Sequence, residues 1–439
     1  MTLKNPAGVN DLLPDAAYRQ HQLIRTAFRV FGCYGYRYME TPLFEKTEVF
    51  TRGIGEATDV VGKEMYYVYP MSSIARVSVE DTSALESLAL RPENTAGIAR
   101  AAVQHNLVPP GAPQAKLWYA GSMFRHERQQ KGRYREFRQI GAECIGATEP
   151  SADAEVIVML LSFFDELGIG REQRVLKINS MGDEACRPAY RGAVRDYILT
   201  RESEFCPECQ RRAISNPLRA FDCKSEACQA ALSDAPRITD YLCEECASQY
   251  AEVKRLLDSS GRAYEEDPRL VRGLDYYTRT VFEVQVDIGL GTQNALGGGG
   301  RYDRLLQEYG AKPTPSLGFA VGLERIVMVL EALGRAPVLP PAARVFVAAV
   351  DEDARSEAFA LALKLREAGV SVELDHQARS LKSQLKVADK IGAGFVVILG
   401  PDEKAQGCYT LRDMTDGTQL TVTHEQLLEY VREGQASTA

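Results

Sequence analysis

The stretch FRHERQQKGRYREFRQIGAE, residues 124–143, decides the fold and is the densest group of polar residues in the chain. Its centre, Gln129–Gly132, is turn-like and is flanked by apolar strand patterns, so it predicts a β-hairpin. Between Phe124 and Arg138 there are six cations and two anions, a local charge of about +4. Arginine suits the planar, bidentate capture of phosphate or carboxylate. The alternative is a solvated edge hairpin carrying surface ion pairs.

The second arm of this hairpin has a polar face. Strand alternation places Phe137, Gln139, Gly141 and Glu143 on one side. An aromatic ring, an amide and a carboxylate in line would suit a polar ligand lying along the strand.

Around the hairpin the pattern predicts an α+β domain built on a largely antiparallel sheet. An amphipathic helix is expected from Asp15 to Tyr34. Short apolar or β-branched runs at irregular intervals then predict strands at Met65–Tyr69, Ser87–Leu90, Lys116–Phe124, Phe137–Ile145 and Val281–Val286.

The remaining chain divides into further regions, in keeping with about three domains for 439 residues. Residues of about 150–265 are helix-rich and cysteine-rich and predict an insertion into a domain spanning 1–335. A proline-rich hinge is expected at 336–342. Strands and helices alternate regularly from 343 to 439, which predicts an α/β domain with a mostly parallel sheet.

Composition excludes several classes of protein. The 52 Lys and Arg against 60 Asp and Glu give a net charge of −8, which argues against a general nucleic-acid coat protein. No signal peptide is visible in Met1–Asp15, and no run approaches 18 apolar residues. We therefore expect a cytoplasmic protein without a membrane span, whose ten cysteines are free thiols or metal ligands.

Three further polar stretches suggest binding chemistry. Arg272–Arg279 combines tyrosines, arginines and an aspartate, although it could be a turn entering a strand. The Gly297–Gly300 run implies close approach of another group, or a flexible loop. Ser316–Arg325 is a glycine-punctuated strand entering a helix, with Arg325 in the first helical turn. A cation there opposes the helix dipole, which an anionic ligand would explain; the alternative is a tolerated surface arginine.

The cysteines pose a separate question. Two Cys-x-x-Cys pairs, Cys206 with Cys209 and Cys243 with Cys246, match the ligand pattern of a structural tetrahedral zinc site. Cys223 and Cys228 lie between the pairs, so this region has more thiols than the four ligands that a tetrahedral zinc ion takes. The alternative is reduced free cysteines within a helical module.

A basic stripe is predicted in the C-terminal domain. Arg379, Lys382, Lys386 and Lys390 recur every three to four residues, so they would share one helix face. Such a stripe can track a phosphate backbone, whereas the alternative is a solvated helix face.

Taken together, these stretches resemble the class II aminoacyl-tRNA synthetases, and among them the histidyl-tRNA synthetase family. Thr41-Pro42-Leu43 resembles the end of class II motif 1, Phe124–Glu143 resembles motif 2, and Gly318–Arg325 resembles motif 3. Leu270–Thr280 and Gly297–Asp303 resemble the two histidine-specific signatures. Asn94 and Gln129 depart from the glycine and proline that are usual in the family.

The resemblance implies roles for matching residues. Arg125 and Arg272 would be catalytic, at the α-phosphate of ATP and the histidine carboxylate. Glu127 and Phe137 would bind adenine, and Arg325 the γ-phosphate. The implied histidine-binding residues are Glu93, Thr95, Arg125, Gln139, Glu143, Arg272, Tyr276 and Tyr277.

The resemblance also implies the overall function. A class II catalytic core with a helical insertion and a C-terminal α/β anticodon-binding domain would ligate L-histidine to tRNA(His) through a histidyl-adenylate. ATP would be a substrate with Mg²⁺, and the protein would be a homodimer. The alternative is the catalytically inactive, synthetase-like regulatory subunit of ATP phosphoribosyltransferase, which lacks the anticodon-binding domain and has eroded signatures.

Overall fold

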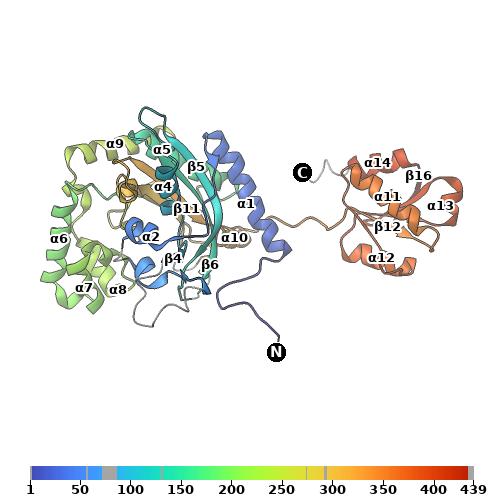
Figure 1. Ribbon diagram of the computed structural model, residues 1–439, viewed down its shortest axis with the longest axis horizontal. Helices are drawn as coiled ribbons and strands as arrows, with labels where there is room; N and C mark the ends of the chain where they lie inside the picture. The colour runs from blue at the N-terminus through green and yellow to red at the C-terminus, as the bar shows by residue number, and fades with distance from the viewer. Residues whose placement is uncertain are drawn as a thin grey trace. The chain divides into compact units, whose positions relative to one another are not determined.

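The computed structural model describes residues 2–55, 58–71, 87–128, 130, 132–272, 274–290 and 294–433. The chain forms two compact units, Met1–Val338 and Leu339–Ala439, with the boundary inside the predicted hinge (Figure 1). Gln129, Lys131 and Gly273, which belong to stretches singled out above, lie outside the described residues.

An eight-stranded sheet organises the described part of the larger unit. Its strand order is β1-β5-β6-β11-β10-β9-β7-β8. The outer pairs β1·β5 and β7·β8 are parallel, and the pairs between them are antiparallel. The strands are β1 (Arg37–Tyr38), β5 (Ala115–Phe124), β6 (Glu136–Ile145), β7 (Val175–Ser180), β8 (Glu265–Glu266), β9 (Thr278–Gln285), β10 (Ala295–Arg301) and β11 (Ser316–Gly322). The predicted antiparallel α+β core is confirmed.

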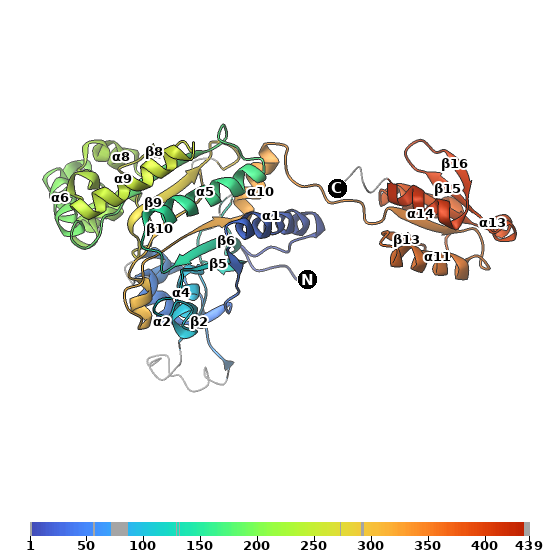
Figure 2. The same cartoon turned by 90° about the horizontal axis from the view of Figure 1, so that it is seen from above.

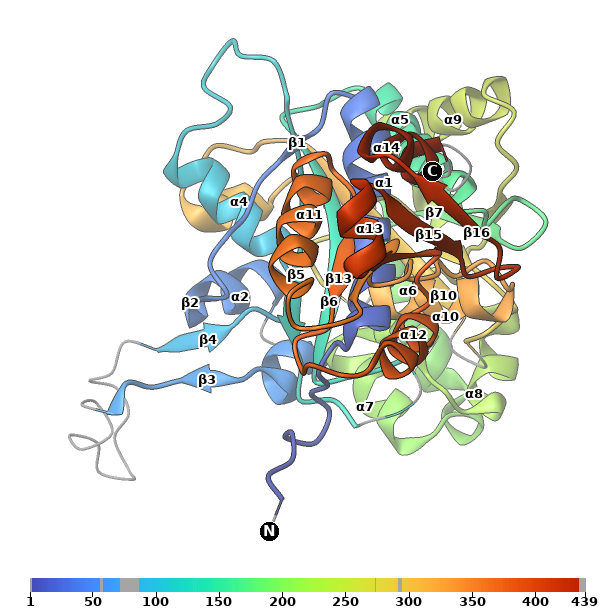
Figure 3. The ribbon, with the colours of Figure 1, turned by 90° about the vertical axis from the view of Figure 1, so that its right-hand side faces the viewer.

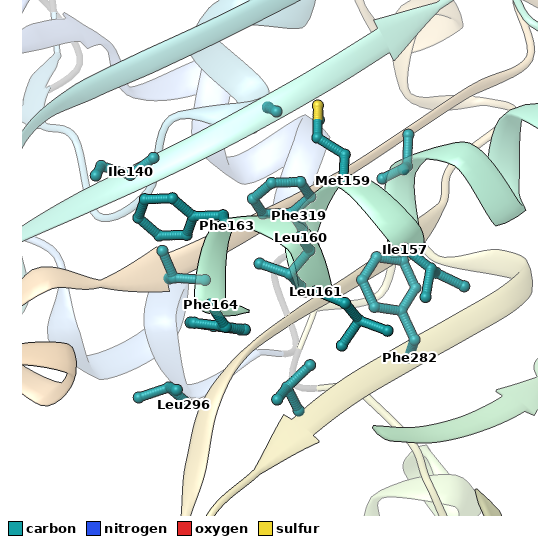
Figure 4. Packing of buried hydrophobic residues seen from close by; sticks show 14 of the residues in the cluster. Ile140, Ile157, Met159, Leu160, Leu161, Phe163, Phe164, Phe282, Leu296 and Phe319 are labelled. Carbon is teal, nitrogen blue, oxygen red and sulfur yellow. The ribbon is translucent and has the colours of Figure 1, made fainter. Parts of the chain in front are cut away.

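One face of this sheet is covered by helices α1 (Pro14–Cys33), α5 (Pro150–Glu166), α9 (Glu244–Ser259) and α10 (Leu323–Ala332) (Figure 2). The α1 helix forms because Leu23, Ala27, Val30 and Phe31 recur at helical spacing and bury one face. Buried residues of α5 interdigitate with the strands, as Figure 4 shows for Phe163 among its neighbours. Each fully buried phenylalanine stabilises the fold by about 1.5–3 kcal/mol.

The opposite face is covered by α4 (Thr95–Gln104), and α2 (Thr47–Ile54) packs against α4. Neighbouring residues of β5 show the two faces, since Trp118 packs in the first core and Tyr119 in the second. A small antiparallel sheet joins β2 (Phe44–Lys46), β4 (Leu88–Leu90) and β3 (Tyr67–Val68) (Figure 3). A π-helical turn, Val60–Glu64, precedes β3.

The cysteine-rich insertion is smaller than predicted. Although the sequence suggests about 150–265, α5, β7, α9 and β8 belong to the main sheet and its helical layer. The pairing of β7 with β9 joins segments far apart in sequence, which local patterns do not reveal. The insertion proper contains α6 (Arg187–Thr200), α7 (Pro207–Ser215), α8 (Glu226–Ala231) and short 3-10 turns at 202–204, 217–222, 232–234 and 238–241, with a core of its own.

The C-terminal unit has a mixed sheet, not the mostly parallel one predicted. The order is β13-β12-β14-β15-β16; the two pairs made by β12 are parallel and the other two antiparallel. A tight turn at Asp413–Thr418 makes the last two strands a hairpin. The elements are β12 (Val345–Ala349), α11 (Arg355–Glu367), β13 (Val372–Leu374), α12 (Leu381–Lys390), β14 (Phe395–Leu399), α13 (Pro401–Gln406), β15 (Tyr409–Asp413), β16 (Gln419–Val422) and α14 (His424–Glu433).

Across the described ranges, no helix has both the length and the apolar character needed to cross a membrane.

Candidate active site

A cavity of about 360 Å³ lies over the polar face of the central strands. Every residue to which the resemblance gives a histidine or ATP role lines it, with the exception of Glu143. These residues come from four separate stretches, between position 93 and position 325. A second cavity, of about 400 Å³, is lined by residues of β7, β8 and the insertion and contains none of them.

The hairpin arginine Arg125 lies at one end of the cavity. Its Nε donates to the Pro92 carbonyl at 2.8 Å, and its guanidinium carbon lies 5.4 Å from the centroid of the Phe137 ring. Glu127 is held by Arg133, whose Nη1 donates to Oε2 at 2.6 Å. These contacts fix the cation and the ring that a nucleotide would meet, so the hairpin is more than a solvated surface ribbon.

The side chain of Arg272 lies against strand β10, which contains the run Gly297–Gly300. Its Nη1 donates to Glu283 Oε2 at 2.6 Å, and its guanidinium lies 5.9 Å from the centroid of the Tyr277 ring. Gly298 pairs with Glu283 in register, and a Cβ at Gly298 would lie 3.0 Å from Arg272 Nη1 and 2.5 Å from the Phe282 carbonyl oxygen. Of the two interpretations of the glycine run, close approach is therefore correct, because the glycines form strand β10 beneath this arginine.

Glu93 caps helix α4. Its two carboxylate oxygens accept the backbone N–H groups of Thr95 at 2.8 Å and Ala96 at 2.9 Å. Burial raises the pKa of Glu93, although these N–H groups oppose the shift. The carboxylate thus has a structural partner, and it also borders the cavity.

Glu143 lies behind the cavity wall and is fully buried. Thr95 Oγ1 donates to its Oε1 at 2.7 Å, and the Tyr302 hydroxyl donates to its Oε2. Burial raises the pKa of Glu143 to about 8, and the bonds from Tyr302 and Thr95 only partly oppose this. Gly318 is paired with it in register, and a Cβ there would lie 1.8 Å from Glu143 Oε2.

Gln139 and two tyrosines complete the predicted histidine-binding set. The Tyr276 and Tyr277 rings lie 4.6 Å apart between centroids, and Tyr276 also meets Tyr302 edge-on at 5.6 Å. Gln139 Oε1 is buried and accepts no hydrogen bond within the described residues. A buried acceptor of this kind requires a donor, which an amino or imidazole N–H of a ligand would supply.

Arg325 is the third residue of α10 and lines the cavity. Burial lowers its pKa, and the nearby Arg133 lowers it further. Both effects mean that an anion between these arginines would be stabilised. The neighbouring Glu324 accepts the backbone N–H of Arg138, at 3.0 and 3.1 Å, and so ties the helix to β6.

Three residues near the cavity had no assigned role in the sequence analysis. Glu283 holds Arg272, Tyr302 holds Glu143, and Asp222 extends the wall from the insertion. Glu283 interrupts the apolar run VFEV of β9, which is a signal that sequence alone could have given. Asp222 carries no such signal, because its approach depends on how the insertion folds.

The predicted four-cysteine zinc site requires correction. The structure separates the two Cys-x-x-Cys pairs into different groups. Cys206 and Cys209 lie with Cys223 and Cys228, whereas Cys243 and Cys246 lie with Asp183 and Cys186. The reason is that Cys243 and Cys246 begin α9, which packs on the main core, while Cys206 and Cys209 begin α7 inside the insertion.

Comparison with known proteins agrees with this geometry. A family model described as histidyl-tRNA synthetase matches residues 8–326. The chain belongs to the histidyl-tRNA synthetase family. A second model, described as an anticodon binding domain, matches residues 344–434. The resemblance drawn from the sequence is thus confirmed, and the chain is a class II aminoacyl-tRNA synthetase with a C-terminal anticodon-binding domain.

Relatives of this synthetase family cover nearly the whole chain. The histidine--tRNA ligase of Anaeromyxobacter dehalogenans is 46% identical over 428 residues, which are 97% of this chain and 99% of the relative. The crystal structure of apo histidyl-tRNA synthetase from S. aureus is 33% identical, with a TM-score of 0.80, and covers 98% of this chain and 100% of that chain.

A second solved structure is described as an ATP phosphoribosyltransferase regulatory subunit/histidyl-tRNA synthetase, from Bacillus halodurans. It is 21% identical, with a TM-score of 0.63, and covers 91% of this chain and 98% of that chain. At this identity it shows the shared fold alone. The regulatory-subunit alternative is therefore less supported than the synthetase.

Proposed function

We propose that this chain ligates L-histidine to tRNA(His) at the cavity over β6, β9, β10 and β11. In the first step a histidine carboxylate oxygen attacks the α-phosphorus of ATP, a new P–O bond forms, and pyrophosphate leaves. In the second step a ribose hydroxyl at the 3′ end of the tRNA attacks the histidyl carbonyl, and AMP leaves. Neither step needs a protein nucleophile, so the protein contributes positioning and charge stabilisation.

The observation that carries this proposal is the convergence of the predicted residues on one cavity. Arg125 and Arg272 would face the α-phosphate and the histidine carboxylate, and Arg325 the γ-phosphate. Phe137 would stack on adenine, beside the Arg125 guanidinium. Arg125 is already bound to the Pro92 carbonyl and Arg272 to the Glu283 carboxylate, which lowers the reorganisation that the reaction requires.

Histidine selection would depend on Gln139, Glu143, Thr95 and the two tyrosines. Gln139 lines the cavity, and its Oε1 meets no donor within the described part of the chain. The Glu143–Thr95–Tyr302 network would orient the hydroxyl groups that meet the imidazole. A site that forms hydrogen bonds with its substrate can reject analogues by a factor of about 10⁴–10⁵.

Mg²⁺ would accompany ATP. The cavity wall offers the carboxylates of Glu127, Glu283 and Asp222, and carboxylate oxygens together with phosphate are the ligands that Mg²⁺ prefers. The ion would neutralise charge on the pyrophosphate. We also propose structural zinc in the insertion, because its clustered thiols are ligands that zinc prefers.

Two surfaces support the proposed macromolecular partners. Lys382, Lys386 and Lys390 are exposed along α12 and would meet tRNA phosphates. Arg379 does not belong to this stripe, because it precedes the helix and is paired with Asp375 at 2.7 Å. Near motif 1, Phe28, Tyr38, Leu43 and Phe44 are about 40–50% exposed, and burial of these side chains in a homodimer would stabilise it. The expected compartment is the cytoplasm.

The decisive experiment is ATP–pyrophosphate exchange with each standard amino acid, followed by charging of tRNA(His). Exchange that depends on histidine alone, together with charging, is the expected result. A regulatory subunit would bind histidine without supporting exchange, and that outcome would overturn the proposal. An Arg171→Ala variant, altered at an exposed arginine that does not line the cavity, is the matched control for arginine variants in the site.

A further inference from the structure

Two groups of metal-ligating side chains lie outside the active site. In each group, one ligand atom from every residue lies within 4.8 Å of the others. The first group is Cys206, Cys209, Cys223 and Cys228; the second is Asp183, Cys186, Cys243 and Cys246. Resting on the proposal that the insertion holds zinc, we infer that this chain holds two zinc ions, and that the second fastens the insertion to the histidine-binding wall.

The geometry of the first group suits tetrahedral zinc. Ligands at about 2.3 Å from a tetrahedral ion lie about 3.8 Å apart. Cys206 Sγ and Cys223 Sγ are 3.9 Å apart, far beyond the roughly 2.05 Å of a disulfide bond. All four residues belong to the insertion, and this group would hold its small core together.

The two groups share one local design. Cys206 and Cys243 each occupy the residue before a helix, and Cys209 and Cys246 lie in the first turn of α7 and α9. In both groups a backbone N–H points at a sulfur: Cys206 N lies 3.2 Å from Cys228 Sγ, and Cys243 N lies 3.0 Å from Cys186 Sγ. Backbone donors of this kind stabilise thiolates, the ionisation state that binds metal.

The second group differs because its ligands come from two layers. Asp183 and Cys186 follow β7, whereas Cys243 and Cys246 begin α9. An ion held by all four would join the end of a sheet strand to the start of a helix about 60 residues later. Three thiolates and one carboxylate form a closed four-coordinate set, as a structural zinc site requires.

This second group is connected to the histidine-binding wall. Arg279 donates its backbone N–H to the Gly182 carbonyl at 2.8 Å, and its guanidinium lies 3.5 Å from Asp183 Oδ2. Arg279 has a φ of 50°, a strained conformation for a residue with a side chain. The neighbouring Tyr277 has its carbonyl bound by Arg187, which directly follows Cys186. An ion at Asp183 and Cys186 would therefore hold the backbone that positions Tyr277.

The test counts zinc bound to the full-length protein purified under reducing conditions. Two zinc ions per chain are expected in the wild type and in the control Cys33→Ser, which alters an exposed cysteine of α1. Cys206→Ser should lose one ion, and Cys243→Ser should lose the other. Asp183→Asn should lose the same ion as Cys243→Ser and raise the KM for histidine more than the KM for ATP.

Each other outcome has a defined meaning. No zinc in the wild type would overturn zinc in the insertion altogether, whereas one ion lost by both Cys206→Ser and Cys243→Ser would overturn the two-site arrangement. Should a variant fail to fold, titration of the metal-free wild type with Co²⁺ replaces it. Two equivalents with thiolate charge-transfer and tetrahedral d–d absorption are then expected, and a single equivalent contradicts the inference. Histidine-dependent exchange, measured separately, keeps a failure here distinct from failure of the proposed ligase activity.

Discussion

Cations gather in two places in this chain, and they are held in opposite ways. In the active-site cavity, Arg125 and Arg272 are largely buried and bound to a carbonyl and a carboxylate on neighbouring segments. On α12, Lys382, Lys386 and Lys390 project from one exposed helix face.

The difference separates two uses of positive charge. A buried arginine with a fixed orientation stabilises charge that develops at one atom during a reaction. Exposed lysines on flexible stems attract a polyanion without fixing its geometry, and salt screens that attraction. Under the proposed function, a chain with a net charge of −8 would act on ATP and meet tRNA through these two local concentrations of cation.

The strongest test of the buried group is Arg272→Ala. The substitution removes a guanidinium that Glu283 orients, and it should lower histidine-dependent ATP–pyrophosphate exchange by about 100–1000-fold. Circular dichroism should show an unchanged fold. Near-normal exchange would remove Arg272 from the catalytic set, and Arg171→Ala should leave exchange at the wild-type rate.

The substitution Gly318→Ala tests how closely the strands around Glu143 are packed. Its Cβ would lie 1.8 Å from Glu143 Oε2 and 2.5 Å from the Ala142 carbonyl oxygen. Overpacking of this kind should lower the free energy of unfolding by about 1–3 kcal/mol, as measured by urea denaturation.

The matched control for this glycine is Gly192→Ala. Gly192 lies within helix α6, and a Cβ there would meet no atom within 4 Å. This change should stabilise the protein by about 0.5–1 kcal/mol. If the two alanines had equal effects, the strands around Glu143 would not be as closely packed as the structure indicates.

The exposed lysines of α12 are tested by the double variant Lys382→Glu, Lys386→Glu. Charging of tRNA should fall at low salt, while ATP–pyrophosphate exchange stays unchanged. The salt dependence of tRNA binding should decrease by roughly one unit of slope for each lysine removed. Loss of exchange together with charging would contradict the separation of the two groups.

A different kind of effect, a change in pH dependence, is expected for Glu143→Gln. The pKa of Glu143 is about 8 in the folded chain, above the usual 4.5. Its contribution to stability is therefore fully present below about pH 4.5 and is lost as pH rises towards 8. The variant should differ little from wild type at pH 5 and should lose less stability between pH 5 and 8. If the free energies of unfolding of the wild type and the variant changed equally between pH 5 and 8, Glu143 would not have a raised pKa in the folded chain.

The sequence predicted the hairpin well, because its signals are local. Strands expected at Lys116–Phe124 and Phe137–Ile145 are found as β5 and β6, each within one residue at its start. The alternation that placed Phe137 and Gln139 on one face is also reflected in the cavity wall.

Features that depend on distant pairing were not predictable in the same way. Glycines carry no hydrophobic pattern, so Gly297–Gly300 could not be recognised as a strand. The sequence does not indicate that Asp183 lies beside Cys186, Cys243 and Cys246, because that grouping depends on where β7 ends relative to α9. The roles of Glu283 and Tyr302 likewise arise from contacts across the sheet.

The glycine strand has a consequence for how this sequence can change over evolutionary time. A Cβ at Gly299 would lie 1.9 Å from the Gly318 carbonyl oxygen, a backbone atom that every amino acid possesses. A second mutation cannot make room there, since no side chain is responsible for the clash. Any other residue at this position requires the neighbouring strands to separate. Substitutions of Gly299 should therefore be rejected during evolution, and compensating substitutions elsewhere should not restore them.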